Sequence, residues 1–343
     1  MASHAETSTA RSADWDRPKS ATDGPATDLG RLLAPVRDAL GLVERRISAA
    51  IQTDQPGLTE AYSALFSGGK RIRPAVTLLC AGPAHVTSEP VVALGAALEM
   101  LHSATLIHDD IIDKADTRRG RPTLCRTQGP DTAILAGDHL FALAAVVVTE
   151  TKHLEALRIF AQTLVTISGG ELEQIHRGST LPSQEDYLRL IHAKTACLFE
   201  SAALGGALLA GRPPEEARQF GLYGRNLGLA FQIADDVLDY VGDSARLGKP
   251  TLNDIKRGVL TLPALLYAWE RDDWKGVQLP ERVPQRQVNQ LVRKVIEGGY
   301  VDRALQIARE YAEAAWESVA SLTDGSFGES LRGLSQFALE RVD

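Results

Sequence analysis

Residues 89–113 read "EPVVALGAALEMLHSATLIHDDIID", an apolar stretch that closes on three aspartates. Apolar side chains recur at spacings of three and four, which predicts one buried helix from about residue 91 to the last aspartate. Asp109 and Asp113 lie four residues apart and therefore project from one face, whereas Asp110 points aside. Because aspartate is disfavoured near the C-terminus of a helix, the cluster indicates a binding function instead of a solvated helix end.

A second acidic cluster repeats this spacing in the stretch "NLGLAFQIADDVLDYVGD", residues 226–243. Asp235 and Asp239 again lie four residues apart in an apolar helical pattern. Clustered carboxylates repel one another unless a cation neutralises them, and hard oxygen ligands without a nearby cysteine favour Mg²⁺ or Mn²⁺ over zinc. Mg²⁺ commonly shares its coordination shell with substrate phosphates, so the clusters predict a phosphorylated substrate. About three Mg²⁺ ions would balance the four carboxylates and a diphosphate, which would then become a good leaving group.

The rest of the chain shows a helical pattern almost everywhere from Leu29 onward. Short breaks rich in Gly and Pro separate the helices, and none has the length of an interdomain linker. We therefore expect one all-α domain, a bundle of helices, over residues 29–343. Residues 1–28 are rich in Ala, Ser, Thr, Asp and Pro without an apolar period, which predicts a disordered tail.

Composition excludes several classes of function. The net charge of −7 gives no basic surplus for a nucleic-acid backbone, so we expect no nucleic-acid partner. Cys80, Cys125 and Cys197 stand far apart, which argues against a disulfide framework or a zinc site and favours a reducing, cytoplasmic location. No run approaches the ~18 uninterrupted apolar residues of a membrane span, so no integral membrane segment is predicted.

Basic residues accompany the acidic clusters. The loop "SGGKRIRP", residues 67–74, carries three cations at the start of a predicted helix: Lys70, Arg71 and Arg73. Arg118 and Arg119 follow the first acidic cluster directly, and His102 lies two turns before Asp109 on the same helix face. Together these groups could hold a second diphosphate without a metal ion.

Five ordered motifs resemble those of the trans-isoprenyl diphosphate synthases, also called polyprenyl synthetases. They are "GGKRIRP", "LIHDDIIDKADTRRGRPT", "AKTACLFESAALGG", "YGRNLGLAFQIADDVLDYVGD" and "LGKPTLNDIKRGVLTLPAL". The resemblance extends from about Leu29 to the C-terminus and departs from many members at Val259, where they carry lysine. It implies the family's all-α fold of antiparallel helices around a deep central cavity, and a homodimer.

The resemblance also implies a role for each matching residue. The implied ligands of Mg²⁺, which Mn²⁺ could replace, are Asp109, Asp113 and Asp235, and Asp239 completes the second cluster. The residues implied to hold the allylic diphosphate are Arg118, Lys194 and Lys249. Those implied to hold isopentenyl diphosphate are Lys70, Arg73, His102 and Arg119. Thr195 and Gln232 would line the cleft near the developing allylic cation.

The implied reaction is a head-to-tail (1′-4) condensation in the trans configuration. The allylic diphosphate ionises with the help of Mg²⁺, the isopentenyl double bond attacks the resulting cation, and a proton is lost to the released diphosphate. No side-chain general base is therefore expected.

Product length is expected to depend on the helix face that precedes Asp109. In the family, bulky aromatics four or five residues before the first aspartate close the tunnel and give short products. Here these positions are Thr105 and Ala104, so the chain resembles the medium- and long-chain members. Leu101 and, on the expected facing helix, Phe141 are further candidates for chain-length control. The alternative is that the small residues merely allow close helix packing. A long apolar product also leaves room for a transient membrane contact on release.

Three alternative functions stay open. A class I terpene cyclase shares the aspartate-rich helix, but such enzymes usually replace the second cluster and lack an isopentenyl diphosphate pocket. A metal-dependent phosphohydrolase could use "IHDD" as a His-Asp metal pair, although it leaves the second cluster unexplained. A non-catalytic subunit of a heteromeric synthase typically lacks the aspartates that are present here.

Overall fold

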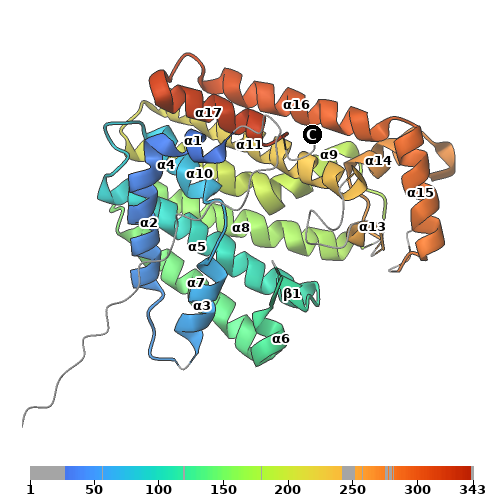
Figure 1. The fold of residues 1–343 in the computed structure, drawn as a ribbon, viewed down its shortest axis with the longest axis horizontal. Helices are drawn as coiled ribbons and strands as arrows, with labels where there is room; N and C mark the ends of the chain where they lie inside the picture. Colours follow the sequence, from blue (N-terminus) through green and yellow to red (C-terminus); the bar gives the residue numbers. More distant parts are fainter. Residues whose placement is uncertain are drawn as a thin grey trace, which may run out of the picture.

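Figure 1 shows the computed structural model of the chain, a layered array of helices. The structure describes residues 28–340 except 56, 119, 179, 242–251, 257, 275, 276, 278, 279 and 281, and it leaves the side chains of residues 253 and 254 undescribed. Helices make up nearly all the regular structure of this described part, so the all-α prediction is confirmed.

The elements of the N-terminal half are α1 (Leu29–Leu32), η1 (Ala34–Val36), α2 (Arg37–Ala50), α3 (Leu58–Phe66), α4 (Ile72–Ala81), α5 (Glu89–Ile112), β1 (Thr117–Arg118), β2 (Arg121–Pro122), α6 (Leu124–Gln128), α7 (Pro130–Thr149) and α8 (Leu154–Arg177). Those of the C-terminal half are α9 (Gln184–Ile191), η2 (His192–Ala196), α10 (Cys197–Leu209), α11 (Pro214–Val241), α13 (Asn253–Lys256), α14 (Leu262–Trp269), η3 (Asp272–Trp274), α15 (Gln285–Glu297), α16 (Tyr300–Val319) and α17 (Gly325–Phe337).

The core is built around α5, which is buried on nearly all faces along most of its length. Helices α2, α4, α7 and α10 pack against it. Helix α10 also packs on α11, and α16 runs along α11 across the top of Figure 1. A second apolar cluster joins α14, α15 and α16. The two helices that carry the acidic clusters, α5 and α11, therefore share α10 as a neighbour.

Two glycines let α11 approach its neighbours very closely. A Cβ atom at Gly224 would lie 2.2 Å from the carbonyl oxygen of Phe199, and one at Gly228 would lie 2.5 Å from the Cα atom of Ala196. No side chain fits at such distances, so the backbones themselves are in contact here. Because Ala196 ends η2, the contact fixes η2 against the middle of α11.

The observed elements differ from the sequence predictions in two places. Helix α5 begins at Glu89 and ends at Ile112, and Asp113 caps it with its N–H donating to the Asp109 carbonyl at 2.8 Å. The segment predicted as a simple break after Asp113 contains the small antiparallel hairpin β1–β2. The predicted tail lies outside the described residues except for Asp28, whose side chain accepts a hydrogen bond from Gly30 N at the start of α1.

Two helices, α5 and α7, are long and apolar enough to cross a membrane by length and composition alone. The apolar window of α5 is 78% buried inside the protein, as in a core helix, whereas that of α7 is 39% buried. The apolar character of α5 is thus explained by the core, and that of α7 only in part.

Candidate active site

Asp109 and Asp113 lie in the last turn of α5 and at its C-cap. Asp113 is exposed, while Asp109 is partly buried. Burial raises the pKa of Asp109 to about 6, although Lys194 and Arg118 lower it and Glu171 and Asp113 add negative charge nearby. The predicted pair therefore faces a mixed environment of acidic and basic side chains.

Glu171 is a carboxylate near Asp109 that the sequence analysis did not single out. It lies on α8 directly after Gly170, where a Cβ atom would lie 2.4 Å from the Cβ atom of Ala193 on η2. The close approach of α8 to η2 thus carries Glu171 toward the first acidic cluster. The adjacent glycines in "SGGELEQ" were the available sequence signal, since they permit such an approach.

Asp110 turns away from its two neighbours, as predicted, but into the protein and not toward solvent. Its side chain is buried, and Arg118 Nε donates to its Oδ1 atom at 2.8 Å. Arg118 belongs to β1, so this ion pair ties the hairpin to the end of α5. Arg118 was predicted to hold the allylic diphosphate, and the pair with Asp110 fixes one side of its guanidinium group.

The second acidic cluster lies near the C-terminal end of α11. Asp235 and Asp239 are partly buried and Asp236 is buried. Gln232, one turn earlier, donates from Nε2 to Asp236 Oδ1 at 3.0 Å and accepts at Oε1 from the Thr195 hydroxyl at 2.6 Å. The predicted partners Thr195 and Gln232 are therefore in direct contact.

The turn η2 stands between the two acidic helices. It is π-helical. This conformation is rare in proteins overall, but where it occurs it is often at a functional site, because it turns side chains out of α-helical register. Its Lys194 acts electrostatically on Asp109 of α5, while its Thr195 bonds Gln232 of α11. His192 Nε2 lies 2.7 Å from Glu200 Oε2, which links the first residue of the turn to α10. One turn of helix therefore connects the two clusters that the sequence placed 126 residues apart.

The three cations of the segment 67–74 differ in their surroundings: one is buried and shapes the loop, and the other two are at least partly exposed and lie over aromatic rings. Arg71 is buried in a left-handed conformation (φ 50°), donates to the carbonyls of Gly68 and Phe66, and pairs with Glu99 at 3.4 Å. It holds the loop in shape. Lys70 is exposed, and its ammonium lies 4.7 Å from the ring centroid of Phe337. Arg73 is partly buried, with its guanidinium 4.8 Å from the ring centroid of Phe199.

The candidates for chain-length control lie on α5, except for Phe141, which lies on the neighbouring α7. Leu101 and Ala104 are fully buried, and Thr105 is partly buried with its hydroxyl donating to the His102 carbonyl at 2.7 Å. Phe141 packs against His108, with ring centroids 5.2 Å apart. Phe141 thus lies beside the last two turns of α5. Arg119 and Lys249, two further predicted site residues, lie outside the described part of the chain.

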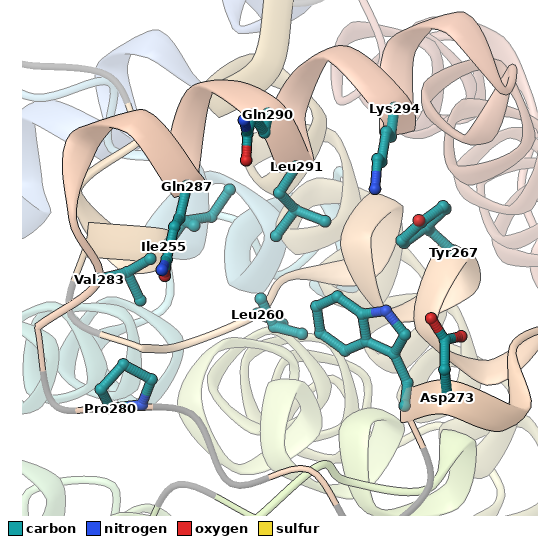
Figure 2. Close-up of a pocket in the computed structure, with 11 residues that line it drawn as sticks. Ile255, Leu260, Tyr267, Asp273, Pro280, Val283, Gln287, Gln290, Leu291 and Lys294 are labelled. Carbon is teal, nitrogen blue, oxygen red and sulfur yellow. The ribbon is translucent and has the colours of Figure 1, made fainter.

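A pocket of about 210 Å³ lies between α13, α14 and α15 (Figure 2). Its walls are mainly apolar, with Leu260 and Tyr267 facing Leu291 of α15, and Lys294 and Asp273 stand at one side. None of the site residues described above lines it. The pocket is lined by other residues than the acidic clusters, although Leu260 lies only two residues before Leu262, whose N–H points at Asp236.

The donor set of the two clusters fits a hard divalent cation. Every predicted ligand is a carboxylate oxygen. Among the described side chains no three His, Cys, Asp or Glu residues converge closely enough to hold a metal ion by themselves. Such a cation would complete its shell with water and substrate oxygens, as Mg²⁺ typically does.

Comparison with known proteins agrees with these features. The Polyprenyl synthetase family matches residues 55–297 of the chain. The octaprenyl diphosphate synthase of Escherichia coli is 35% identical over 286 residues, which cover 82% of this chain and 88% of that protein. The all-trans-nonaprenyl-diphosphate synthase of Rhodobacter capsulatus is 35% identical over 321 residues, which cover 91% of this chain and 97% of that protein. A crystal structure of polyprenyl synthase from Caulobacter crescentus, complexed with calcium and isoprenyl diphosphate, has a TM-score of 0.84 and 34% identity, and covers 94% of this chain and 100% of that one. The chain belongs to the polyprenyl synthetase family.

Proposed function

We propose that this chain is a trans-polyprenyl diphosphate synthase that joins isopentenyl diphosphate head-to-tail to an allylic diphosphate. The observation that carries the proposal is η2, which connects the two acidic helices through Lys194 and Thr195. A site with carboxylates on two helices and cations between and beside them suits a substrate with a diphosphate leaving group. The family match and the names of the relatives support elongation over cyclisation.

Asp109, Asp113 and Asp235 would hold the metal ions, with Asp239 completing the second cluster. Mg²⁺, about three ions and replaceable by Mn²⁺, would neutralise the diphosphate so that it can depart. The divalent cation in the crystals of the Caulobacter relative supports a divalent-metal requirement.

Two sets of cations would hold the two substrates. The residues proposed for the allylic diphosphate are Arg118, Lys194 and Lys249. Those proposed for isopentenyl diphosphate are Lys70, Arg73, His102 and Arg119. Both Lys70 and Arg73 face an aromatic ring, which limits the conformations of these long side chains before substrate binds. Their charge is thus partly oriented in advance.

We propose a medium- or long-chain product. The relatives include enzymes named for octaprenyl, nonaprenyl and decaprenyl products. Ala104 and Thr105 are small where aromatics would shorten the product, and α7, which packs against α5, also carries small residues such as Ala144. Thr195 and Gln232 would lie beside the developing cation, and the released diphosphate would take the proton.

We also propose a cytoplasmic homodimer that contacts membranes transiently when it releases its product. Support for the dimer comes from large apolar side chains that are more than half exposed on two neighbouring helices. They are Leu135 and Val146 on α7 and Leu154, Val165, Leu172 and Ile175 on α8. A second copy of this chain would bury such a surface.

The proposal is tested by incubating the protein with labelled isopentenyl diphosphate and allylic primers of ten, fifteen and twenty carbons. We expect elongated trans products with Mg²⁺ and none in excess chelator. Asp109→Ala and Asp235→Ala should each reduce turnover by about a thousandfold, because each removes a ligand that acts on the leaving group. A cyclised hydrocarbon from one primer alone would favour a cyclase, and free phosphate a phosphohydrolase.

A further inference from the structure

A chain of hydrogen bonds runs behind the second acidic cluster and uses side chains to which the proposed function gives no role. Tyr187 of α9 donates its hydroxyl proton to Asp236 Oδ2 at 2.7 Å, and the backbone N–H of Leu262 points at the same oxygen at 3.4 Å. Gln232 donates to the other oxygen of Asp236 and accepts from Thr195. Elements α9, α11 and the start of α14 therefore meet at the Asp236 carboxylate, and η2 joins them through Gln232.

The inner end of this chain is closed to solvent. Tyr187 is 3% exposed and Asp236 is 6% exposed. Burial, followed by the charge of Asp236, raises the pKa of Tyr187 well above its usual range, so its hydroxyl keeps its proton and can donate it. A buried carboxylate is stabilised by such donors on both of its oxygens.

The donor and the acceptor of each hydrogen bond in the chain are fixed by the Asp236 carboxylate, which can only accept. Because Asp236 accepts, Gln232 must present its NH₂ group to Asp236 and its carbonyl oxygen to Thr195. A threonine hydroxyl has a single proton, and here that proton is donated to Gln232. Lone pairs are then all that the Thr195 oxygen can offer to any other group.

We propose that Asp236 and Tyr187 are positioning residues that set the polarity of Thr195 and Gln232 for the condensation. The inference rests on the proposed function, in which Thr195 lies beside the developing allylic cation. An oxygen that offers only lone pairs places the negative end of its dipole toward a positive charge and stabilises it. If Gln232 were turned over, Thr195 would accept from it, and its proton could point at the cation instead.

The test uses Asp236→Asn, which keeps the shape of the side chain. While Tyr187 holds the new carbonyl oxygen, the new NH₂ group faces the NH₂ group of Gln232, so Gln232 is expected to turn over. We expect kcat to fall about tenfold to a hundredfold, since the change reorients an electrostatic partner without removing it. The KM values of both substrates and the Mg²⁺ concentration for half activity should stay within about twofold. Tyr187→Phe should also lower kcat, but by a smaller factor than Asp236→Asn.

A matched control and a double-mutant cycle separate positioning from a structural role. Tyr223→Phe removes another buried tyrosine hydroxyl, which donates to the Leu331 carbonyl at 2.8 Å, and should leave kcat unchanged. Thr195→Val should lower kcat by itself but add little in the Asp236→Asn background, because the two changes remove the same interaction. Thermal unfolding of each variant shows whether it is folded.

The outcomes are distinct. A wild-type protein that makes no elongated product overturns the proposed function. An active wild type whose Asp236→Asn variant keeps kcat within about twofold overturns the positioning role alone, and so do additive losses in the cycle. If Asp236→Asn does not fold, Tyr187→Phe with Thr195→Val forms the cycle and decides in the same way.

Discussion

Asp109 carries a charge that its surroundings oppose. Burial raises its pKa to about 6 from an ordinary value of 3.8, so the folded protein holds this proton more tightly than the unfolded chain does. The stability that this proton provides is present at low pH and is lost as the pH rises through about 6. Binding a cation there must displace the proton, so metal affinity should increase over the same range.

We therefore predict that the metal-free protein becomes less stable between about pH 4 and pH 6.5, by on the order of 2 kcal/mol from this group. Unfolding temperatures measured in chelator across this range would show the decrease. Asp109→Asn should flatten it, since an amide has no proton to lose. Parallel curves for wild type and variant would contradict the assignment.

Lys70 offers charge outside the acidic clusters. We predict that Lys70→Ala raises KM for isopentenyl diphosphate by about tenfold or more and changes KM for the allylic substrate little, because an ammonium–phosphate contact is lost at one pocket. Steady-state kinetics with each substrate varied would measure both values. Lys152→Ala, at an exposed lysine after α7, is the matched control. An effect confined to the allylic substrate would mean that the two pockets are reversed.

At this scale the sequence predicted what depends on spacing along one helix. Four-residue spacing was enough to single out Asp109 with Asp113 and Asp235 with Asp239. It could not indicate that Asp110 pairs with Arg118, because that contact depends on how the hairpin folds back. Two partners of Asp236 likewise come from other elements, α9 and α14, and only Gln232 lies one turn away on the same helix.

Among the elements, η2 depends most on its neighbours. Gly228 allows the backbone of α11 to contact η2, and the resulting position of η2 places Thr195 against Gln232. A π-helical turn has no distinctive sequence signal, because its extra residue is accommodated by packing and not by local propensity. The sequence therefore predicted one continuous helical region here without the turn.

We predict that Gly228→Ala lowers the free energy of unfolding by about 1–3 kcal/mol and reduces kcat, since the new methyl group must push α11 and η2 apart. Chemical denaturation and steady-state kinetics would measure the two effects. Gly41→Ala on α2, where a Cβ atom meets only the end of Arg45 at 3.6 Å, is the control. Unchanged kcat in a folded Gly228→Ala protein would show that η2 tolerates the displacement.

The burial of Ala104 and Thr105 on α5 decides which of them is the better position to test the chain-length prediction. Ala104 is fully buried, so a phenylalanine there risks overpacking, whereas Thr105 is partly buried. We predict that Thr105→Phe shortens the product while the first condensation continues, because the ring occupies volume that later isoprene units need. Mass analysis of the products measures the length, and Thr105→Val, which adds little volume, is the control. A folded, active variant with the wild-type product length would show that Thr105 does not limit the product, and Phe141 would be the next residue to test.

At the scale of the whole molecule, the exposed apolar faces of α7 and α8 form the proposed dimer interface. We predict that Leu135→Lys weakens self-association by about tenfold or more, because a charge replaces an apolar contact in the interface. Sedimentation across a concentration series would measure the equilibrium. Leu222→Lys on α11, also an exposed leucine, is the control. A wild-type protein that stays monomeric at every concentration would contradict the dimer.

The all-α class could be predicted from periodicity, because periodicity is a local property of the chain. The contacts that join the C-terminal helix to the N-terminal helices could not be predicted in this way. Helix α17 packs on α1, with a Leu32 methyl carbon 2.2 Å from where a Cβ atom of Gly333 would lie, and the Lys70 ammonium lies over the Phe337 ring. These contacts join residues from opposite ends of the described chain, for which no local pattern exists.

The position of α17 has a consequence for synthesis. The ribosome makes both acidic helices and the basic loop before it makes Phe337, so a nascent chain holds most of the proposed site residues while Lys70 still lacks its aromatic neighbour. Pairing between distant segments is also the slow part of folding. A copy released too early by a translation error would therefore keep both acidic helices but lack the helix that packs on α1, and we expect proteases to degrade it because its apolar surface stays exposed.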